Sequence, residues 1–247
     1  MQQQTSIARH EAGVRLSQRE FFNAVFLLMG TGLAITAFVA FLISSNETWM
    51  AALFHLYEKT DGAGKVTTTW TASGWWFLAA GAQLILVFSL SGERMARLNW
   101  QAGASVFAVY AALNGLTLAP VIAAYTAASV TQVFLITAIT FAGCALWGYT
   151  TKRDMTSMGG FFLFALIGLL VAMVMNLIFQ STQMDTLISL VAILLFAALT
   201  AYDIQKLRVL HQNTENHNGI VIYGALTFYL DFINLFIHLL RLIGIRK

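Results

Sequence analysis

The chain has few charged residues: they make up 10% of its 247 positions, whereas hydrophobic residues make up 58%. Soluble domains carry about a quarter charged residues, so a soluble fold of this composition would lack polar side chains to cover its surface. The composition therefore excludes an ordinary soluble domain and indicates that lipid surrounds much of the chain.

Cysteine and proline each occur once, as Cys144 and Pro120. A single cysteine cannot form an internal disulfide, and its position inside an apolar run favours a small packing residue over a reactive thiol. Pro120 lies near the end of an apolar run, where the lost backbone hydrogen bond costs least in a helix.

A nucleic-acid partner is also excluded, although the net charge is +3. The Lys and Arg residues lie almost entirely in short connections between apolar runs. This placement is typical of membrane topology and not of a basic binding stripe.

Seven apolar runs are present, and most reach the length of about 20 residues that crosses a bilayer as a helix. We predict an all-α integral membrane protein with seven transmembrane helices, because hydrocarbon offers no partner for unpaired backbone groups. The first run is longer than the core of a signal peptide, so we expect it to be retained. The runs are Phe21–Ile43, Ala72–Ser91, Ala102–Tyr125, Gln132–Tyr149, Gly159–Phe179, Thr186–Tyr202 and Ile220–Ile245.

Basic residues predict the orientation, because cytoplasmic connections carry an excess of Lys and Arg. Nine lie on the side of the N-terminus: Arg9, Arg15, Arg19, Arg94, Arg97, Lys152, Arg153, Lys206 and Arg208. Five lie on the other side: Lys59, Lys65, Arg241, Arg246 and Lys247. We therefore expect a cytoplasmic N-terminal tail over 1–20, a seven-helix domain over 21–247 with an outer loop at 44–74, and an external C-terminus. Within that loop, Trp49–Tyr57 is expected to form a short helix on the membrane surface.

Asp231 is the outstanding charge inside an apolar run, because it lies about 17 Å into the last predicted helix. Four further polar residues fall within about 40° of the same line on that helix. They are Thr227, Asn234, His238 and Arg241. The stripe must face the bundle interior or a water-filled cavity. It favours an ion or proton pathway over a hydrogen-bonded packing stripe.

A second carboxylate, Asp203, closes the sixth apolar run. Alone it would be interpreted as an interfacial charge. The connection 204–219 brings the last helix back beside the sixth, so contact with Asp231 is geometrically allowed. Two carboxylates in contact cannot both ionise cheaply in a low dielectric, so they would share one proton.

Two alternative functions, those of a retinal-type photoreceptor and of an intramembrane protease, are excluded because the chain lacks the residues that they require. A retinal-type photoreceptor needs a lysine in mid-membrane, but all five lysines lie outside the apolar cores. An intramembrane protease needs a nucleophile–base pair or a metal motif such as His-Glu-x-x-His, and neither occurs in a suitable position. We therefore expect no enzymatic activity.

Four runs of sequence resemble the Bax inhibitor family, also called the transmembrane Bax inhibitor motif or lifeguard family, in a bacterial form. They are NGLTLAP at 114–120, TKRDMTSMGG at 151–160, AYDIQ at 201–205 and YLDFINLF at 229–236. The resemblance extends from about residue 21 to the C-terminus.

This resemblance implies a fold of six helices around a central seventh and a pH-sensitive calcium leak gated by an aspartate pair. The pair falls on Asp203 and Asp231, which would hold calcium only transiently as the permeant ion, with no resident cofactor. It also implies an arginine of the second helix, either Arg94 or Arg97, as the partner of Asp203. The expected location is a bacterial inner membrane. The alternative is a non-conducting regulator that binds another membrane protein, such as a membrane-bound protease.

Overall fold

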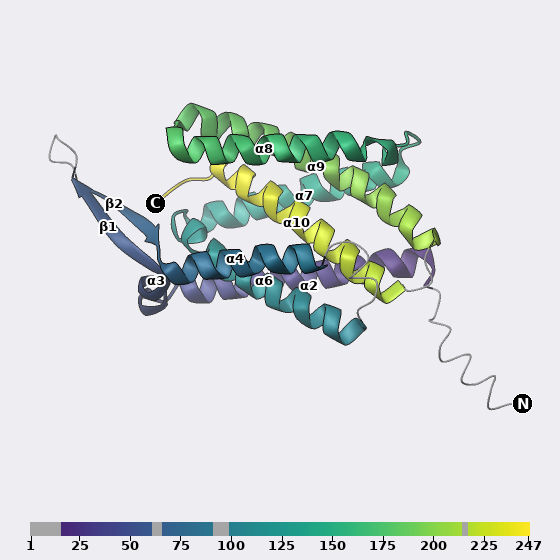
Figure 1. Cartoon of the computed structure of the whole chain (residues 1–247), viewed down its shortest axis with the longest axis horizontal. Coiled ribbons are helices and arrows are strands. Elements are labelled where there is room, and N and C mark those ends of the chain that lie inside the picture. Colours follow the sequence, from purple (N-terminus) through teal and green to yellow (C-terminus); the bar gives the residue numbers. More distant parts are fainter. Residues whose placement is uncertain (1–15, 61–65, 91–98, 214–216) are drawn as a thin grey trace, which may run out of the picture.

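The computed structural model describes residues 16–60, 66–90, 99–213 and 217–247, which form a bundle of helices with one small β-ribbon (Figure 1). The main helices are α2 (Gln18–Ser44), α4 (Gly74–Leu90), α6 (Trp100–Ala123), α7 (Ala127–Thr150), α8 (Gly159–Phe179), α9 (Thr182–Asn213) and α10 (His217–Ile243). The short elements are the helix α3 (Glu47–Leu53), the strands β1 (Phe54–Thr60) and β2 (Val66–Ala72), and the 3-10 helix η1 (Thr156–Met158).

Six of the helices in the described ranges are long and apolar enough to cross a membrane: α2, α6, α7, α8, α9 and α10. The predicted second span corresponds to α4, which has 17 residues. At 1.5 Å per residue it extends about 26 Å, slightly less than a hydrocarbon core of about 30 Å. The helical membrane fold is therefore confirmed, with six helices of spanning length and a shorter seventh apolar helix packed against α6.

The connection between α2 and α4 differs from the expected surface helix over Trp49–Tyr57. The helix α3 ends at Leu53, and the chain continues into an antiparallel ribbon in which Phe54 pairs with Ala72 and Thr60 with Val66. The second strand reads VTTTWTA, and such β-branched and aromatic residues favour strands over helices. The ribbon projects beyond one end of the bundle (Figure 1).

The last helix, α10, is the most buried of the six long helices. It packs against α9, α2, α7 and α6, and it runs through the middle of the bundle in Figure 1. By contrast, α8 packs chiefly against α9 and leaves most of its apolar side chains exposed. Such exposed apolar surface is stable only against lipid, which agrees with a membrane location.

A hydroxyl junction ties α10 to two neighbouring helices. The hydroxyl oxygens of Tyr229 and Thr36 are 2.6 Å apart, and the Thr36 hydroxyl also lies 2.8 Å from the carbonyl oxygen of Ala111 on α6. Tyr229 and Thr36 are both buried. In a low dielectric an unpaired hydroxyl is costly, so this junction specifies how α2, α6 and α10 fit together.

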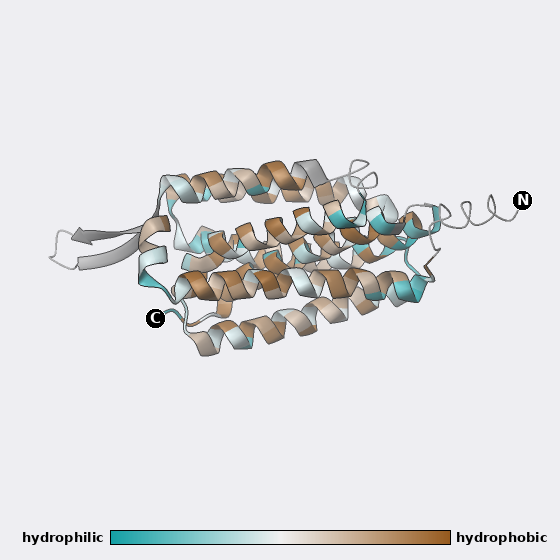
Figure 2. Ribbon diagram, turned by 90° about the horizontal axis from the view of Figure 1, so that it is seen from below, coloured by the Kyte–Doolittle hydropathy of each residue, from teal (hydrophilic) through white to brown (hydrophobic). Residues whose placement is uncertain are grey.

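Polar residues concentrate at the two ends of the bundle and apolar ones along its length (Figure 2). We call one end the Ser17 end, where α2, α8 and α10 begin and α7 and α9 end. The opposite end is the Tyr125 end, where the backbone N–H of Thr126 donates to the carbonyl of Ile245 at 3.0 Å. The first and last helices thus run in the same direction, so Ser17 and Ile245 lie at opposite ends.

The close contact of α7 with α9 predicts a large effect of one methyl group. A Cβ added at Gly148 would lie 2.5 Å from the carbonyl oxygen of Ala201 and 2.6 Å from its Cα, which are backbone atoms that cannot rotate away. We expect Gly148→Ala to destabilise the protein by about 1–3 kcal/mol, as overpacking does. Gly143 on the same helix has open space around it. Gly143→Ala is therefore the matched control, and thermal unfolding in detergent is the measurement. Equal melting temperatures for the two variants would contradict this packing.

Candidate functional site

Asp203 of α9 and Asp231 of α10 face one another inside the bundle, a contact that the chain connection allows and that the family resemblance implies. Their side chains are 7% and 4% exposed, and a side-chain hydrogen bond joins them. A hydrogen bond between two carboxyl groups requires that one of them carry a proton. Among the buried atoms of the described residues, the Oδ2 oxygen of Asp231 has no hydrogen-bond partner. The two helices therefore bring two buried carboxyl groups together, and one of their oxygens has no partner among the described residues.

Asp203 lies inside α9 and not at its end. The sixth apolar run is short, so we expect its helix to continue about one turn beyond Asp203, and α9 in fact continues for ten residues beyond it, to Asn213. Ile204 and Leu207 in this extension are buried, which explains why the helix persists although its outer face is polar. The Asp203 carboxyl group is therefore enclosed by protein.

Among the residues that the structure describes, Lys206 is a cation that interacts with Asp203, and the sequence analysis counted it only as a topology signal. It follows Asp203 by three residues, a spacing that puts both on one face of a helix, and the two side chains interact electrostatically. Its ammonium donates to the hydroxyl of Tyr223 at 3.1 Å. It also lies 5.8 Å from the ring centroid of Tyr202 and 5.7 Å from that of Tyr223. The other candidates, Arg94 and Arg97, lie outside the described residues.

The polar stripe of α10 faces α9 along most of its length. The His238 ring Nδ1 lies 3.4 Å from the Ser189 hydroxyl, and Arg241 lies 3.6 Å from a carboxylate oxygen of Asp185. Two other members bond to their own helix instead. Thr227 donates to the carbonyl of Tyr223 at 2.9 Å, and Asn234 donates to that of Leu230 at 2.8 Å. The structure therefore arranges Asp231, His238 and Arg241 along the contact between α9 and α10, which we call the α9/α10 seam.

The segment 151–158 at the Ser17 end is held to α9 by Gln205. The side-chain carbonyl of Gln205 accepts from the backbone N–H of Met155 at 2.8 Å. Its amide donates to the carbonyls of Arg153 and Gly148, at 2.9 and 3.3 Å. Gln205 is two residues from Asp203. The runs 151–160 and 201–205, which both resemble the Bax inhibitor family, therefore meet beside the carboxyl pair.

Within the same segment, the side chain of Asp154 stabilises the turn at the start of η1. One carboxylate oxygen accepts from the Thr156 hydroxyl at 2.6 Å and from its backbone N–H at 2.9 Å. These hydrogen bonds favour the ionised form and lower the pKa of Asp154 below its ordinary value. These two hydrogen bonds therefore stabilise the turn at pH values above the unfolded-state pKa of the Asp154 carboxyl. The stabilisation is lost as the pH falls through the lowered folded-state pKa.

The carboxyl pair offers few ligands for a metal ion. Among the residues that the structure describes, no three His, Cys, Asp or Glu side chains are grouped to hold one. Calcium takes six to eight oxygen ligands when it is held tightly. Asp203 and Asp231 alone therefore supply fewer oxygen ligands than tight calcium binding requires.

Comparison with known proteins finds one family over nearly the whole chain. The family profile described as "Inhibitor of apoptosis-promoting Bax1" matches residues 18–247. The inner membrane protein YbhL of Escherichia coli is 35% identical over 98% of this chain and 97% of its own length. An uncharacterized membrane protein of Streptococcus pyogenes is 37% identical over 91% of this chain and 92% of its own length. A protein of Deinococcus radiodurans is 38% identical, over 91% of this chain and 90% of its own length. The chain is a multi-pass membrane protein that belongs to the Bax inhibitor family.

Proposed function

We propose that the protein is a pH-sensitive cation leak channel of a bacterial inner membrane, that calcium is a permeant ion, and that it has no enzymatic activity. Asp203 and Asp231 form its gate. One observation carries the proposal: two carboxyl groups from different helices meet in the buried centre of the bundle, and one of their oxygens has no partner. Ionisable groups are costly inside a membrane protein, so a pair with an unsatisfied oxygen favours function over packing.

The gate acts by exchange of the shared proton. While the proton bridges Asp203 and Asp231, α9 and α10 stay joined at the centre of the α9/α10 seam. Loss of that proton places two negative charges together in a low dielectric, and a second proton removes the charge that attracts a cation. A change in pH in either direction therefore changes the contact between the two helices.

The α9/α10 seam supplies the route from the gate to the Tyr125 end. His238 is 2% exposed, whereas the Arg241 and Asp185 side chains are 39% and 44% exposed. Exposed ion pairs contribute only about 0–1 kcal/mol. The Arg241–Asp185 pair is thus an easily opened outer contact, and the buried carboxyl pair is the tighter barrier.

The proposed topology has seven spans, with α4 as the second, α10 at the centre, the N-terminus in the cytoplasm and the C-terminus outside. The excess of Lys and Arg toward the Ser17 end supports it. Reporter fusions at both termini of the protein in bacterial cells test it. We expect a cytoplasmic signal at the N-terminus and an external one at the C-terminus. Signals on one side of the membrane would mean an even number of crossings.

Calcium flux into liposomes tests the function directly. Purified protein is reconstituted with a calcium indicator inside the vesicles, and entry is followed from pH 6 to pH 8. We expect entry above that of protein-free vesicles and a dependence on pH. A well-folded protein that passes no calcium or other cation would contradict the channel and favour the non-conducting regulator.

A further inference from the structure

We propose that the groove between α2 and α7 binds one anionic phospholipid taken from the bilayer. We call it the α2/α7 groove. It has a volume of about 700 Å³ and carries polar side chains at the Ser17 end and apolar ones elsewhere. The polar lining consists of Gln18, Arg19, Asn23 and Tyr149. A groove with this division fits an amphiphile, because the polar end lies where helices begin and end and the apolar part lies at bilayer depth.

The polar end offers positive charge and hydrogen-bond donors to a phosphate. Arg19 lines the groove and is exposed. On the other side, the guanidinium of Arg208 lies 5.6 Å from the ring centroid of Tyr149, and the Gln18 amide donates to the hydroxyl of that tyrosine at 3.4 Å. Guanidinium groups bind phosphate oxygens in a bidentate way. The charge at this end therefore selects an anionic headgroup.

The whole α2/α7 groove has about the depth of one bilayer leaflet, and most of its lining is apolar. Phe22, Phe26 and Met29 line it from α2, and Phe141 and Ala145 line it from α7. Its lining on α2 extends from Gln18 to Gly30, about 18 Å along the helix, and half of a bilayer core measures about 15 Å. An acyl chain that runs down from the headgroup fills this length.

The floor of the α2/α7 groove is formed by the sequence neighbours of the carboxyl pair. Ile204 follows Asp203, Phe232 follows Asp231, and both Ile204 and Phe232 line the groove. A bound chain therefore touches both helices that carry the pair. Regulation of the leak by the lipid rests on the proposed function, whereas binding of the lipid does not.

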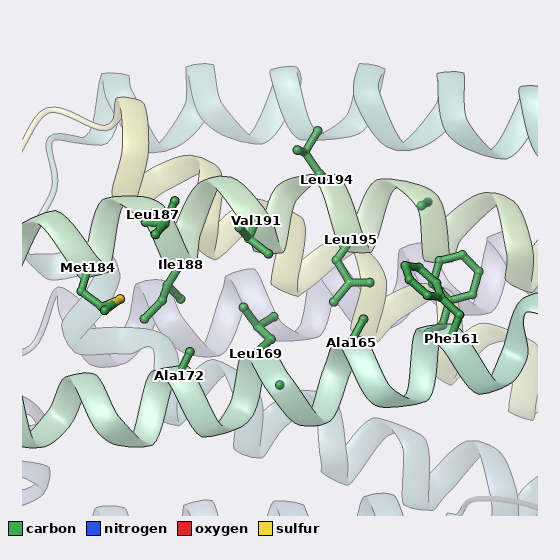
Figure 3. Close-up of a pocket in the computed structure, with 13 residues that line it drawn as sticks. Phe161, Ala165, Leu169, Ala172, Met184, Leu187, Ile188, Val191, Leu194 and Leu195 are labelled. Atoms are coloured by element: carbon green, nitrogen blue, oxygen red, sulfur yellow. The ribbon is translucent and has the colours of Figure 1, made fainter.

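A second groove, between α8 and α9, lacks this division. It has a volume of about 490 Å³, and apolar residues such as Leu169, Ile188 and Leu195 line it throughout (Figure 3). Nothing in its lining distinguishes one lipid from another. It therefore serves as an internal comparison, because it accepts neutral and anionic lipids alike.

Native mass spectrometry of the full chain in detergent tests the headgroup. Dioleoylphosphatidylglycerol, dioleoylphosphatidylcholine and inorganic phosphate are titrated separately. We expect one phosphatidylglycerol adduct at roughly tenfold lower concentration than the phosphatidylcholine adduct, as charge-assisted hydrogen bonds provide, and no retained phosphate. Arg19→Gln and Arg208→Gln should each remove most of this preference. Arg153→Gln, also exposed at the Ser17 end but outside the groove, should not.

Two glycine variants test the apolar part. Gly30 lines the groove and Gly143 does not, and a Cβ at either position meets open space. We expect Gly30→Leu to weaken the phosphatidylglycerol adduct several-fold and Gly143→Leu to leave it unchanged. Equal binding by all variants, or a dimer of the chain in place of the lipid adduct, would overturn the lipid site. If lipid binding follows the expected pattern but no variant passes calcium, the lipid site stands and the channel fails.

Discussion

Replacing Asp231 with asparagine is expected to flatten the pH dependence of the calcium leak while the protein stays folded. The amide has nearly the same shape as the carboxyl group and still hydrogen-bonds to Asp203, but it cannot exchange the shared proton. One linked proton changes an equilibrium by at most about tenfold per pH unit. We therefore expect the several-fold change in calcium entry between pH 6 and pH 8 to shrink to less than about twofold in the variant.

The symmetry of the pair sharpens this test. Asp203→Asn removes the other half of the same proton-sharing group, so it should flatten the profile equally. Thr227→Val is the matched control, because Thr227 lies on the same stripe of α10 but its hydroxyl bonds to its own helix at 2.9 Å. A control profile like that of wild type is expected. An unchanged profile in well-folded Asp231→Asn would reduce the carboxyl pair to a packing contact.

The sequence predicts the helices and the position of Asp231 because both depend on local patterns. An apolar run of spanning length forms a helix in lipid whatever its neighbours are, and Gly159–Phe179 coincides with α8 at both ends. In the same way, the helical spacing of the polar residues in the last run shows which face of that helix is polar. What it does not show is which helix that face meets. The antiparallel packing of α9 beside α10 decides this, and it brings Asp231 to Asp203 and His238 to Ser189.

Features that depend on tertiary contacts were not predictable from the pattern. The ten residues of α9 beyond Asp203 are mixed in polarity, and their helix persists because Ile204 and Leu207 are buried by neighbouring helices. Gln205 has no recognisable role until the segment 151–158 folds onto it. Similarly, Lys206 looked like one more cytoplasmic charge because its contact with Tyr223 depends on the packing of α10 against α9. The spacing of Lys206 from Asp203 was the one signal that pointed to it.

The position of Lys206 gives the second large expected effect. Lys206→Gln should raise calcium entry at a pH at which the wild-type protein passes little calcium. The Lys206 ammonium interacts electrostatically with Asp203, and the Tyr223 hydroxyl of α10 accepts its hydrogen bond at 3.1 Å. It therefore joins α9 to α10 and attracts the carboxylate. Loss of an attraction between two charges that are partly shielded from water weakens the closed state by on the order of 1 kcal/mol, which corresponds to about a fivefold rise in leak.

Four comparison variants separate this role from that of a general surface charge. Lys152→Gln removes an exposed cation at the same end and should leave the leak unchanged. Tyr223→Phe keeps the Lys206 charge but removes the hydroxyl that positions it, so an intermediate rise is expected. The sequence also points to Arg94 or Arg97 as the partner of Asp203, and single replacements of these two with glutamine extend the series. If either arginine variant leaks and Lys206→Gln does not, the second helix holds Asp203. If calcium entry rises only in Lys206→Gln and Tyr223→Phe, the contact between α9 and α10 is what keeps the channel closed.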